Sequence, residues 1–288
     1  MYDALANHFE AGRPRLRGIA YRILGSFHDA DDAVQEAWLR LSHQNPAEIE
    51  NVDGWLATVV ARICVDVLRT RRAKREESLE TQLPDFIVSR DSDPEAAAVT
   101  ADSLGLAATI VLESLTPSER VAFVLHDMFA VPFEQIAPIV DRSEMATRQL
   151  ASRARRRVRA ADAPSAPFAR RKAIVETFVS AARDGDVERL LGVLDPDVLL
   201  RADREPALHG IRGAKTVASQ ASGFSRVVSS MEFVVVNGEP GVRSWLSNGE
   251  PLSVMGFVVG GDRIVAMYVV SQPDRLRHIL PPSSVHRS

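Results

Sequence analysis

This sequence contains too few of several residue types to support some common protein classes. Its 288 residues include one cysteine, Cys64, which excludes an internal disulfide and a cysteine-based zinc site. The seven histidines are scattered, with no two at metal-ligand spacing, and we expect neither a metal nor a cofactor. The longest stretch without charge, Pro251 to Gly261, is eleven residues. A membrane helix needs about twenty apolar residues, so we expect no membrane partner.

The first ten residues lack the basic start and the apolar core of a secretory signal, which predicts a cytoplasmic location. Hydrophobic residues make up 45% of the chain and charged residues 25%, as in ordinary globular proteins. Wholesale disorder is therefore not expected. At roughly 100–200 residues per domain, the length predicts two or three domains.

The net charge of −3 conceals segments of strongly opposite charge. Arg142 to Arg159 contains seven arginines and one acid, and Arg69 to Arg75 contains five basic residues and no acid. Between these clusters, Glu76 to Asp102 contains eight acids and one arginine. Because binding follows the local electrostatic field, two separate basic clusters favour a nucleic-acid partner over solvated helix faces.

Helical periodicity dominates the first 160 residues. Apolar residues repeat at helical spacing over 16–24, 34–41 and 56–68, which predicts a helical domain over residues 1–75. Asp29 to Asp32 supplies candidate N-caps for the second of these helices. Residues 76–103 are acidic and show no sustained period, which is typical of a tether.

A second helical domain is predicted over residues 104–162. Thr116, Pro117 and Glu119 form a specific helix start, with an N-cap, a proline at the first helical position and an early acid. A short helix over 133–140, a turn at 141–143 and an arginine-rich helix from Glu144 form the pattern of a helix-turn-helix.

The C-terminal part, residues 168–288, has a different pattern. Residues 171–194 read as two helices, and strands are predicted over 233–236, 254–259 and 264–270. Asn237-Gly238 and Gly260 to Asp262 predict hairpin turns. We therefore expect an α+β domain, an antiparallel sheet with helices on one face.

The arginine-rich helix predicts a DNA contact. Four residues occupy one face by their spacing and predict base contacts in the major groove: Arg148, Gln149, Ser152 and Arg153. Four others are better placed for phosphate contacts, which position a protein without reading sequence: Arg155, Arg156, Arg157 and Arg159. The simpler alternative is a basic helical hairpin without base recognition.

Four segments carry a resemblance to a known family. Residues 29–41 resemble region 2.2 of extracytoplasmic-function sigma factors, and residues 54–69 resemble their regions 2.3 and 2.4. Residues 115–120 and 147–156 resemble region 4. The order of the motifs and the acidic segment between them are also those of the family. The chain is thus identified as similar to a sigma factor over about 130 of its first 160 residues.

The resemblance implies partners and the residues that contact them. Region 2.2 implies binding to core RNA polymerase through Asp31, Asp32, Gln35, Glu36, Leu39 and Arg40. Trp38 is assigned to the core, and Cys64 to a packed apolar position. Region 2 implies opening of the −10 promoter element and capture of a flipped base, and region 4 implies binding to the −35 element. DNA contacts in region 2 are assigned to Arg62, Asp66, Arg69, Arg71 and Arg72.

Residues 168–288 resemble the SnoaL-like domain, a cystatin-like cone, that is fused to one group of these sigma factors, the SigJ type. The segment Gln272, Pro273, Asp274, Arg275 and Leu276 is similar to that group's Asn-Pro-Asp-Lys-Leu motif. The resemblance implies regulation by the chain's own C-terminal domain in place of a separate anti-sigma factor, with an interdomain role for residues 272–276. A small ligand is left open.

Two other functions remain open. One is a ligand-responsive regulator that binds DNA without polymerase, although such a protein has no use for a region 2.2 helix. The other is a SnoaL-like enzyme with a DNA-targeting arm, using Asp203, Glu205, Arg201 and His209. A catalytic carboxylate needs burial or a neighbour that tunes its pKa, and the sequence indicates neither, so we predict a solvated ion-pair surface and no enzyme.

Overall fold

The structure, a computed structural model, describes residues 2–44, 49, 51–77, 83–90, 104–161, 166–204, 207–208, 210–224 and 227–280. The chain divides into two compact units, Met1–Leu79 with Val111–Ala160, and Glu80–Ile110 with Ala161–Ser288. The second unit therefore includes residues that the sequence assigned to the linker over 76–103. Each unit has its own core and is described by itself.

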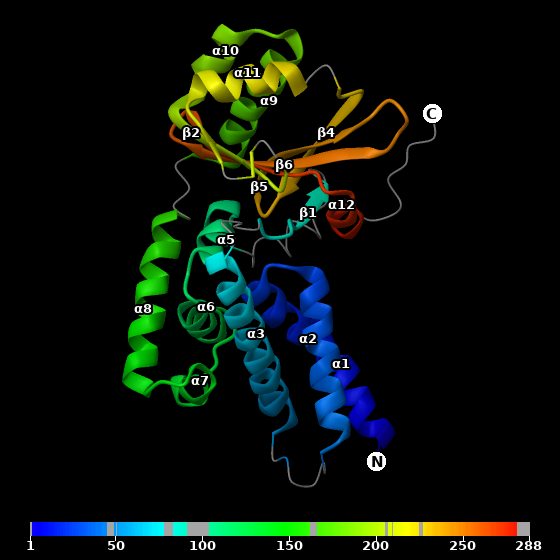
Figure 1. Cartoon of the computed structure of the whole chain (residues 1–288), viewed down its shortest axis with the longest axis vertical. Helices are drawn as coiled ribbons and strands as arrows, with labels where there is room; N and C mark the ends of the chain where they lie inside the picture. The colour runs from blue at the N-terminus through cyan, green and yellow to red at the C-terminus, as the bar shows by residue number, and fades with distance from the viewer. Residues whose placement is uncertain are drawn as a thin grey trace. The chain divides into compact units, whose positions relative to one another are not determined.

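The first unit is helical, as predicted (Figure 1). Its apolar stripes bury residues such as Ile19, Val34 and Val60 almost completely. The second helix begins differently from the prediction, because Ser26 is its N-cap and accepts from the backbone N–H of Asp29. The helices are α1 (Tyr2–Leu24), α2 (Phe27–Ser42), α3 (Val52–Glu77), α6 (Pro117–Phe123), a π-helical turn (Val124–Met128), α7 (Phe133–Val140) and α8 (Glu144–Ala161).

The predicted helix-turn-helix is confirmed in α7 and α8, at the predicted bounds. The start of α6 is a capping box, because Thr116 accepts from the N–H of Glu119 and Glu119 accepts from the N–H of Thr116. The turn between α7 and α8 uses Asp141 in the left-handed region, at φ 57°. Aspartate tolerates this conformation better than most residues, which explains how the turn forms without the glycine common at such turns.

The second unit is an α+β domain. Its sheet has the order β1-β4-β5-β6-β7-β2-β3, with the predicted hairpins β4–β5 and β6–β7. The expectation of a wholly antiparallel sheet is wrong at one place, because β2 lies parallel to β7. The elements are β1 (Val88–Arg90), α5 (Leu106–Glu113, of which residues to Ile110 belong here), α9 (Phe168–Asp184), α10 (Val187–Val193), β2 (Leu194–Ala202), β3 (Ile211–Arg212), α11 (Ala214–Phe224), β4 (Ser230–Val236), β5 (Glu239–Trp245), β6 (Pro251–Gly260), β7 (Arg263–Val270) and α12 (Pro273–Ile279).

Both faces of this sheet are buried. Helices α9, α10 and α11 cover one face, and α12 with the linker residues Leu83 and Phe86 and with Leu106 covers the other (Figure 1). The expectations of helices on one face only, and of a simple tether over 76–103, are therefore wrong for the described part of the linker. Leu83 and Phe86 are buried, and β1 adds a strand beside β4. Residues 78–82 and 91–103 lie outside the described residues.

Gly256 allows close packing on the second face of the sheet. A Cβ at this position would lie 2.5 Å from the Cδ2 of Leu106, closer than packed atoms approach. The missing side chain leaves the space in which Leu106, at the start of α5, is buried against β6. The predicted fold class, helical sigma-type domains followed by an α+β domain, is confirmed. Among the described helices, none has the length and apolar character to cross a membrane.

Candidate polymerase and nucleic-acid interfaces

The outer surface of α2 combines charges with one exposed apolar side chain. Five of the six residues predicted there are exposed and Glu36 is half-buried; the five are Asp31, Asp32, Gln35, Leu39 and Arg40. Leu39 is 47% exposed and is one of four large apolar residues that are exposed in the described part of the chain. The surface is partly ordered by ion pairs, Arg17 to Asp31 at 2.7 Å and Arg40 to Glu36 at 2.9 Å. An apolar residue ringed by ordered charges suits a protein partner.

Trp38 lies on the inner side of this helix. It is half-buried, and its ring centroid lies 4.9 Å from that of Phe9 on α1. Cys64, on α3, is completely buried, and burial raises the pKa of its thiol far above the ordinary value. The assignment of Cys64 to a packed apolar position is therefore confirmed.

Helix α3 presents the predicted region 2 residues unequally. Arg62, Asp66, Arg69 and Arg72 are exposed. Arg71 instead donates to the carbonyl of Leu24 at 3.0 Å and pairs with Asp29. Burial acts to raise the pKa of Asp29, but hydrogen bonds with Ser26 and Arg71 outweigh it and hold the pKa below its ordinary value. Arg71 thus caps the C-terminal end of α1, a role that its sequence position did not predict.

Arg120 was also missed, and it is the largest fully buried side chain described. Its guanidinium donates to the carbonyl of Ile23 at 2.9 Å and forms two bonds to Glu113, at 2.8 and 3.2 Å. Ile23 and Leu24 are the last residues of α1, whose carbonyls have no partner within the helix. Arg120 and Arg71 satisfy these two carbonyls, with positive charge at the negative end of the helix dipole.

The burial pattern of α8 defines its outward face. Thr147, Ala151, Ala154 and Val158 are buried. At 100° per residue, the opposite side is centred on Gln149, Ser152 and Arg156, and it also includes Met145, which is 72% exposed. Met145 was not predicted. No hydrogen bond or ion pair joins the side chain of Gln149, Ser152, Arg156 or Arg159 to another described residue, so these side chains are available to DNA.

Other arginines of α8 contact their own unit. Arg148 pairs with Glu144 and lies over the ring of Phe133, with its Cζ 4.9 Å from the centroid. Three more contact other segments of the unit: Arg153 to Glu119 at 3.5 Å, Arg155 to Asp127 at 2.5 Å, and Arg157 to Ser114 at 2.9 Å. The hydrogen bond to Asp127 raises the pKa of Arg155. These contacts orient the basic side of α8, and DNA contacts by these four arginines remain predictions.

The predicted regulatory segment 272–276 surrounds a buried carboxylate. Asp203 is 5% exposed, and its side chain accepts from the N–H and hydroxyl of Ser271 and from the N–H of Gln272, at 2.8 to 3.1 Å. Arg275 also donates to it, at 3.4 Å. The expectation of a solvated surface is therefore wrong for Asp203. Pro273 and Asp274 are exposed, and Leu276 is buried in the core beneath.

Arg275 joins this carboxylate to the linker. Its guanidinium donates to Asp85 at 2.9 and 3.0 Å and to the carbonyl of Leu83 at 2.8 Å. Asp85 is 6% exposed, so Arg275 supplies positive charge to two buried acids. We call Asp203, Arg275 and Asp85 the linker latch.

A second contact between the linker and the C-terminal sheet lies in the β4–β5 turn. The Asn237 side chain accepts from the N–H of Ile87 at 3.1 Å, and the Asn237 N–H donates to the Ile87 carbonyl at 2.9 Å. Asn237 is 2% exposed at φ 48°. The turn was predicted from Asn237-Gly238, but its contact with a segment 150 residues away was not.

Comparison with known proteins places this arrangement in a family. Residues 8–74 match Sigma-70 region 2, and residues 111–158 match Sigma-70 region 4. The chain is 35% identical to the ECF RNA polymerase sigma factor SigJ of Mycobacterium tuberculosis, over 93% of this chain and 92% of SigJ. It belongs to the extracytoplasmic-function sigma factors. The probable ECF sigma factor SigI of the same organism is 31% identical, over 96% of each chain.

The similarity to this sigma factor group extends to the C-terminal domain. The crystal structure of the Mycobacterium tuberculosis sigma factor SigJ aligns with a TM-score of 0.71 and 33% identity, covering 94% of this chain and 98% of that one. As a sigma factor, the protein acts with core RNA polymerase at promoter DNA, and it is not an enzyme. Of the enzyme-type cluster considered above, Glu205 and His209 lie outside the described residues.

Proposed function

We propose that this sigma factor binds core RNA polymerase through the outer surface of α2, defined by Asp31, Asp32, Gln35, Glu36, Leu39 and Arg40. The exposed Leu39 among ordered charges carries this proposal. Burying the side chain of Leu39 against a partner contributes favourable binding free energy, because apolar surface is removed from water. The acids favour a basic partner surface and raise the association rate.

Charge reversal on this surface tests the proposal. Asp32→Lys with Glu36→Lys should abolish binding to purified core polymerase in a pull-down, because like charges would then face the partner. The fold should persist, since the double variant breaks only exposed pairs worth about 0.5 kcal/mol each. Thermal melting followed by circular dichroism checks this.

Glu176→Lys with Glu188→Lys is the matched control. Both residues are exposed on helices of the second unit, and the change in net charge is the same. The control should bind polymerase normally. Retention of the α2 variant on core polymerase would refute the assignment and would leave direct DNA binding without polymerase as the better account of the surface.

We further propose that the outward face of α8 reads the −35 element and that the exposed residues of α3 contact the −10 element. The availability of Gln149, Ser152 and Arg156 supports the first part, because glutamine and arginine pair with adenine and guanine edges. The exposed Arg62, Asp66 and Arg69 on one side of α3 support the second.

Two substitutions on α8 should have different effects. Gln149→Ala should cost about 1–3 kcal/mol at one position of the −35 element and relax the preference there. Arg159→Ala should weaken binding to all sequences alike and reduce the salt dependence of the affinity. Fluorescence anisotropy with a set of single-base promoter variants at several salt concentrations separates the two. A uniform loss in both variants would contradict base reading by Gln149.

Finally, we propose that the C-terminal domain regulates the factor by holding the linker between regions 2 and 4. The linker latch and the Asn237 contact support this, because both attach residues 83–87 to the C-terminal sheet. When the linker is bound to the sheet, less free chain joins the two DNA-binding regions. Release of the linker latch therefore changes the range of separations that the two regions can adopt at a promoter.

A further inference from the structure

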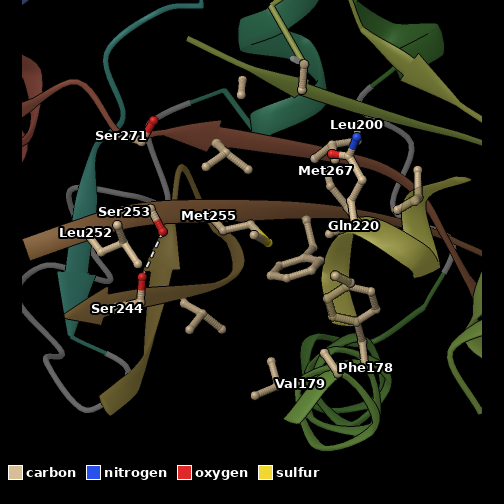
Figure 2. Close-up of a pocket in the computed structure, with 18 of the residues that line it drawn as sticks. Phe178, Val179, Leu200, Gln220, Ser244, Leu252, Ser253, Met255, Met267 and Ser271 are labelled. Carbon is tan, nitrogen blue, oxygen red and sulfur yellow. Dashed lines mark hydrogen bonds between the residues drawn. The ribbon is translucent and has the colours of Figure 1, made fainter. Parts of the chain in front are cut away.

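The second unit contains a cavity of about 320 Å³. Its walls come from α9, α11 and the strands of the sheet, and most of the side chains in them are apolar (Figure 2). Phe178 on α9 and Met255 and Phe257 on β6 are examples. Cavities of this size with a few polar groups in an apolar wall are the usual form of small-molecule sites.

The buried polar group of the cavity is a pair of serines. Ser244 and Ser253 are 3% and 1% exposed, and their hydroxyls lie 2.8 Å apart. Figure 2 shows this pair at one side of the cavity and Phe178 and Gln220 at the other. One hydrogen bond uses one hydroxyl hydrogen, and no other described side chain bonds to the pair. The second hydroxyl hydrogen remains available to a ligand oxygen.

The charge of the wall restricts the ligand class. Of the described residues that line the cavity, only Arg204 carries a charge, and Arg204 is exposed. The inner part therefore provides hydroxyls but no counter-ion. Because burial of an unpaired ion is very costly, a ligand that fills this part is neutral there.

We propose that this cavity binds a small, neutral, mainly apolar molecule whose one hydroxyl or carbonyl oxygen bonds to the Ser244–Ser253 pair. The site is connected to the linker latch, since Ser271 lines the cavity and donates twice to Asp203. A ligand that displaces Ser271 alters the hold of Asp203 on Arg275. The effect of the ligand on the linker rests on the proposed role of the linker latch, whereas ligand binding itself does not.

Binding is tested on the full chain with 2-naphthol as the probe. We expect a Kd of about 0.1 mM or tighter by fluorescence titration, an ordinary affinity for a ligand of this size. The carboxylate analogue, 2-naphthoate, should bind at least about tenfold more weakly, because no counter-ion lies in the inner part. Tighter binding of 2-naphthoate would overturn the neutral class, and no 2-naphthol binding at about 1 mM would overturn the site.

Matched variants locate the probe. Ala221→Trp fills the cavity from α11 and should reduce the affinity at least about tenfold, whereas Ser219→Trp, exposed on the same helix, should leave it unchanged. Ser253→Ala should reduce the preference for 2-naphthol over naphthalene about 2–10-fold, the range for one hydrogen bond. Equal affinities in the two tryptophan variants would place the probe elsewhere and overturn the proposal.

Hydrogen exchange tests the connection to the linker. Saturating 2-naphthol should change the exchange rate of the amides in residues 83–90 in the parent chain but not in Ala221→Trp. Binding without such a change overturns the connection and leaves the binding site standing. The role of the latch itself is tested separately, without ligand, through Arg275.

Discussion

Replacing Arg120 with methionine should lower the unfolding free energy of the first unit by about 3–5 kcal/mol. The substitution leaves the Glu113 carboxylate, whose side chain is 8% exposed, without its partner, and it leaves the Ile23 carbonyl unpaired at the end of α1. Each unpaired group lowers the stability substantially, because water cannot replace the guanidinium at a buried position. Hydrogen exchange of α1 and α6 amides in increasing urea measures the change.

Two further variants separate the causes. Arg148→Met also removes an arginine–glutamate pair, but this pair is exposed, and we expect a loss below about 0.5 kcal/mol. Glu113→Leu combined with Arg120→Met should be less destabilised than Arg120→Met alone, since no unpaired charge is left inside. If the double variant were equally unstable, the unpaired carboxylate would not be the cause.

Replacing Arg275 with alanine should release the linker from the C-terminal sheet. Asp85 and Asp203 would both lose the hydrogen bonds and the positive charge of Arg275, and Leu83 would lose the Arg275 donor to its carbonyl. Hydrogen bonds that involve charged groups stabilise by about 1.5–3 kcal/mol, so the amides of residues 83–90 should exchange about 10–100-fold faster. Run-off transcription with core polymerase should change in the same variant.

Arg277→Ala is the control for this experiment. Arg277 lies two residues further along α12, and its pair with Asp274 is exposed. This variant should retain the parent's exchange rates and transcription. If Arg275→Ala accelerated exchange without altering transcription, the latch would be structural only and the regulatory proposal would be wrong.

Much of the first unit could be predicted because its signals are local. Helix α7 and the start of α8 follow from apolar spacing and turn residues within a few positions, and the Thr116–Glu119 capping box is contained in four residues. The N-cap of α2 was misassigned to the acids because several good cap residues stand close together. The outward face of α8 was only partly predicted, since side-chain spacing does not reveal which side is buried.

In the second unit, local sequence signals predicted some features but not those that depend on contacts distant in the sequence. Its hairpins were predicted from turn residues and β-branched runs, and both hairpins are present. The parallel pairing of β2 with β7 was not predicted. The paired residues are 67 to 70 positions apart in the sequence, and neither segment carries a signal of its partner. The apolar runs in β4, β6 and β7 do indicate burial on both faces, but not which segment covers the second face.

The sequence by itself determined the helical nature of the first unit, the helix-turn-helix, the two hairpins and the family, because periodicity, caps and turn chemistry act over a few residues. Only the tertiary structure decided which charged residues are structural. Arg71, Arg120 and Arg275 find their partners 47, 97 and 190 residues away. An arginine looks the same in a sequence whether it faces DNA or a buried carboxylate, and the difference arises only when the fold removes one side of it from water.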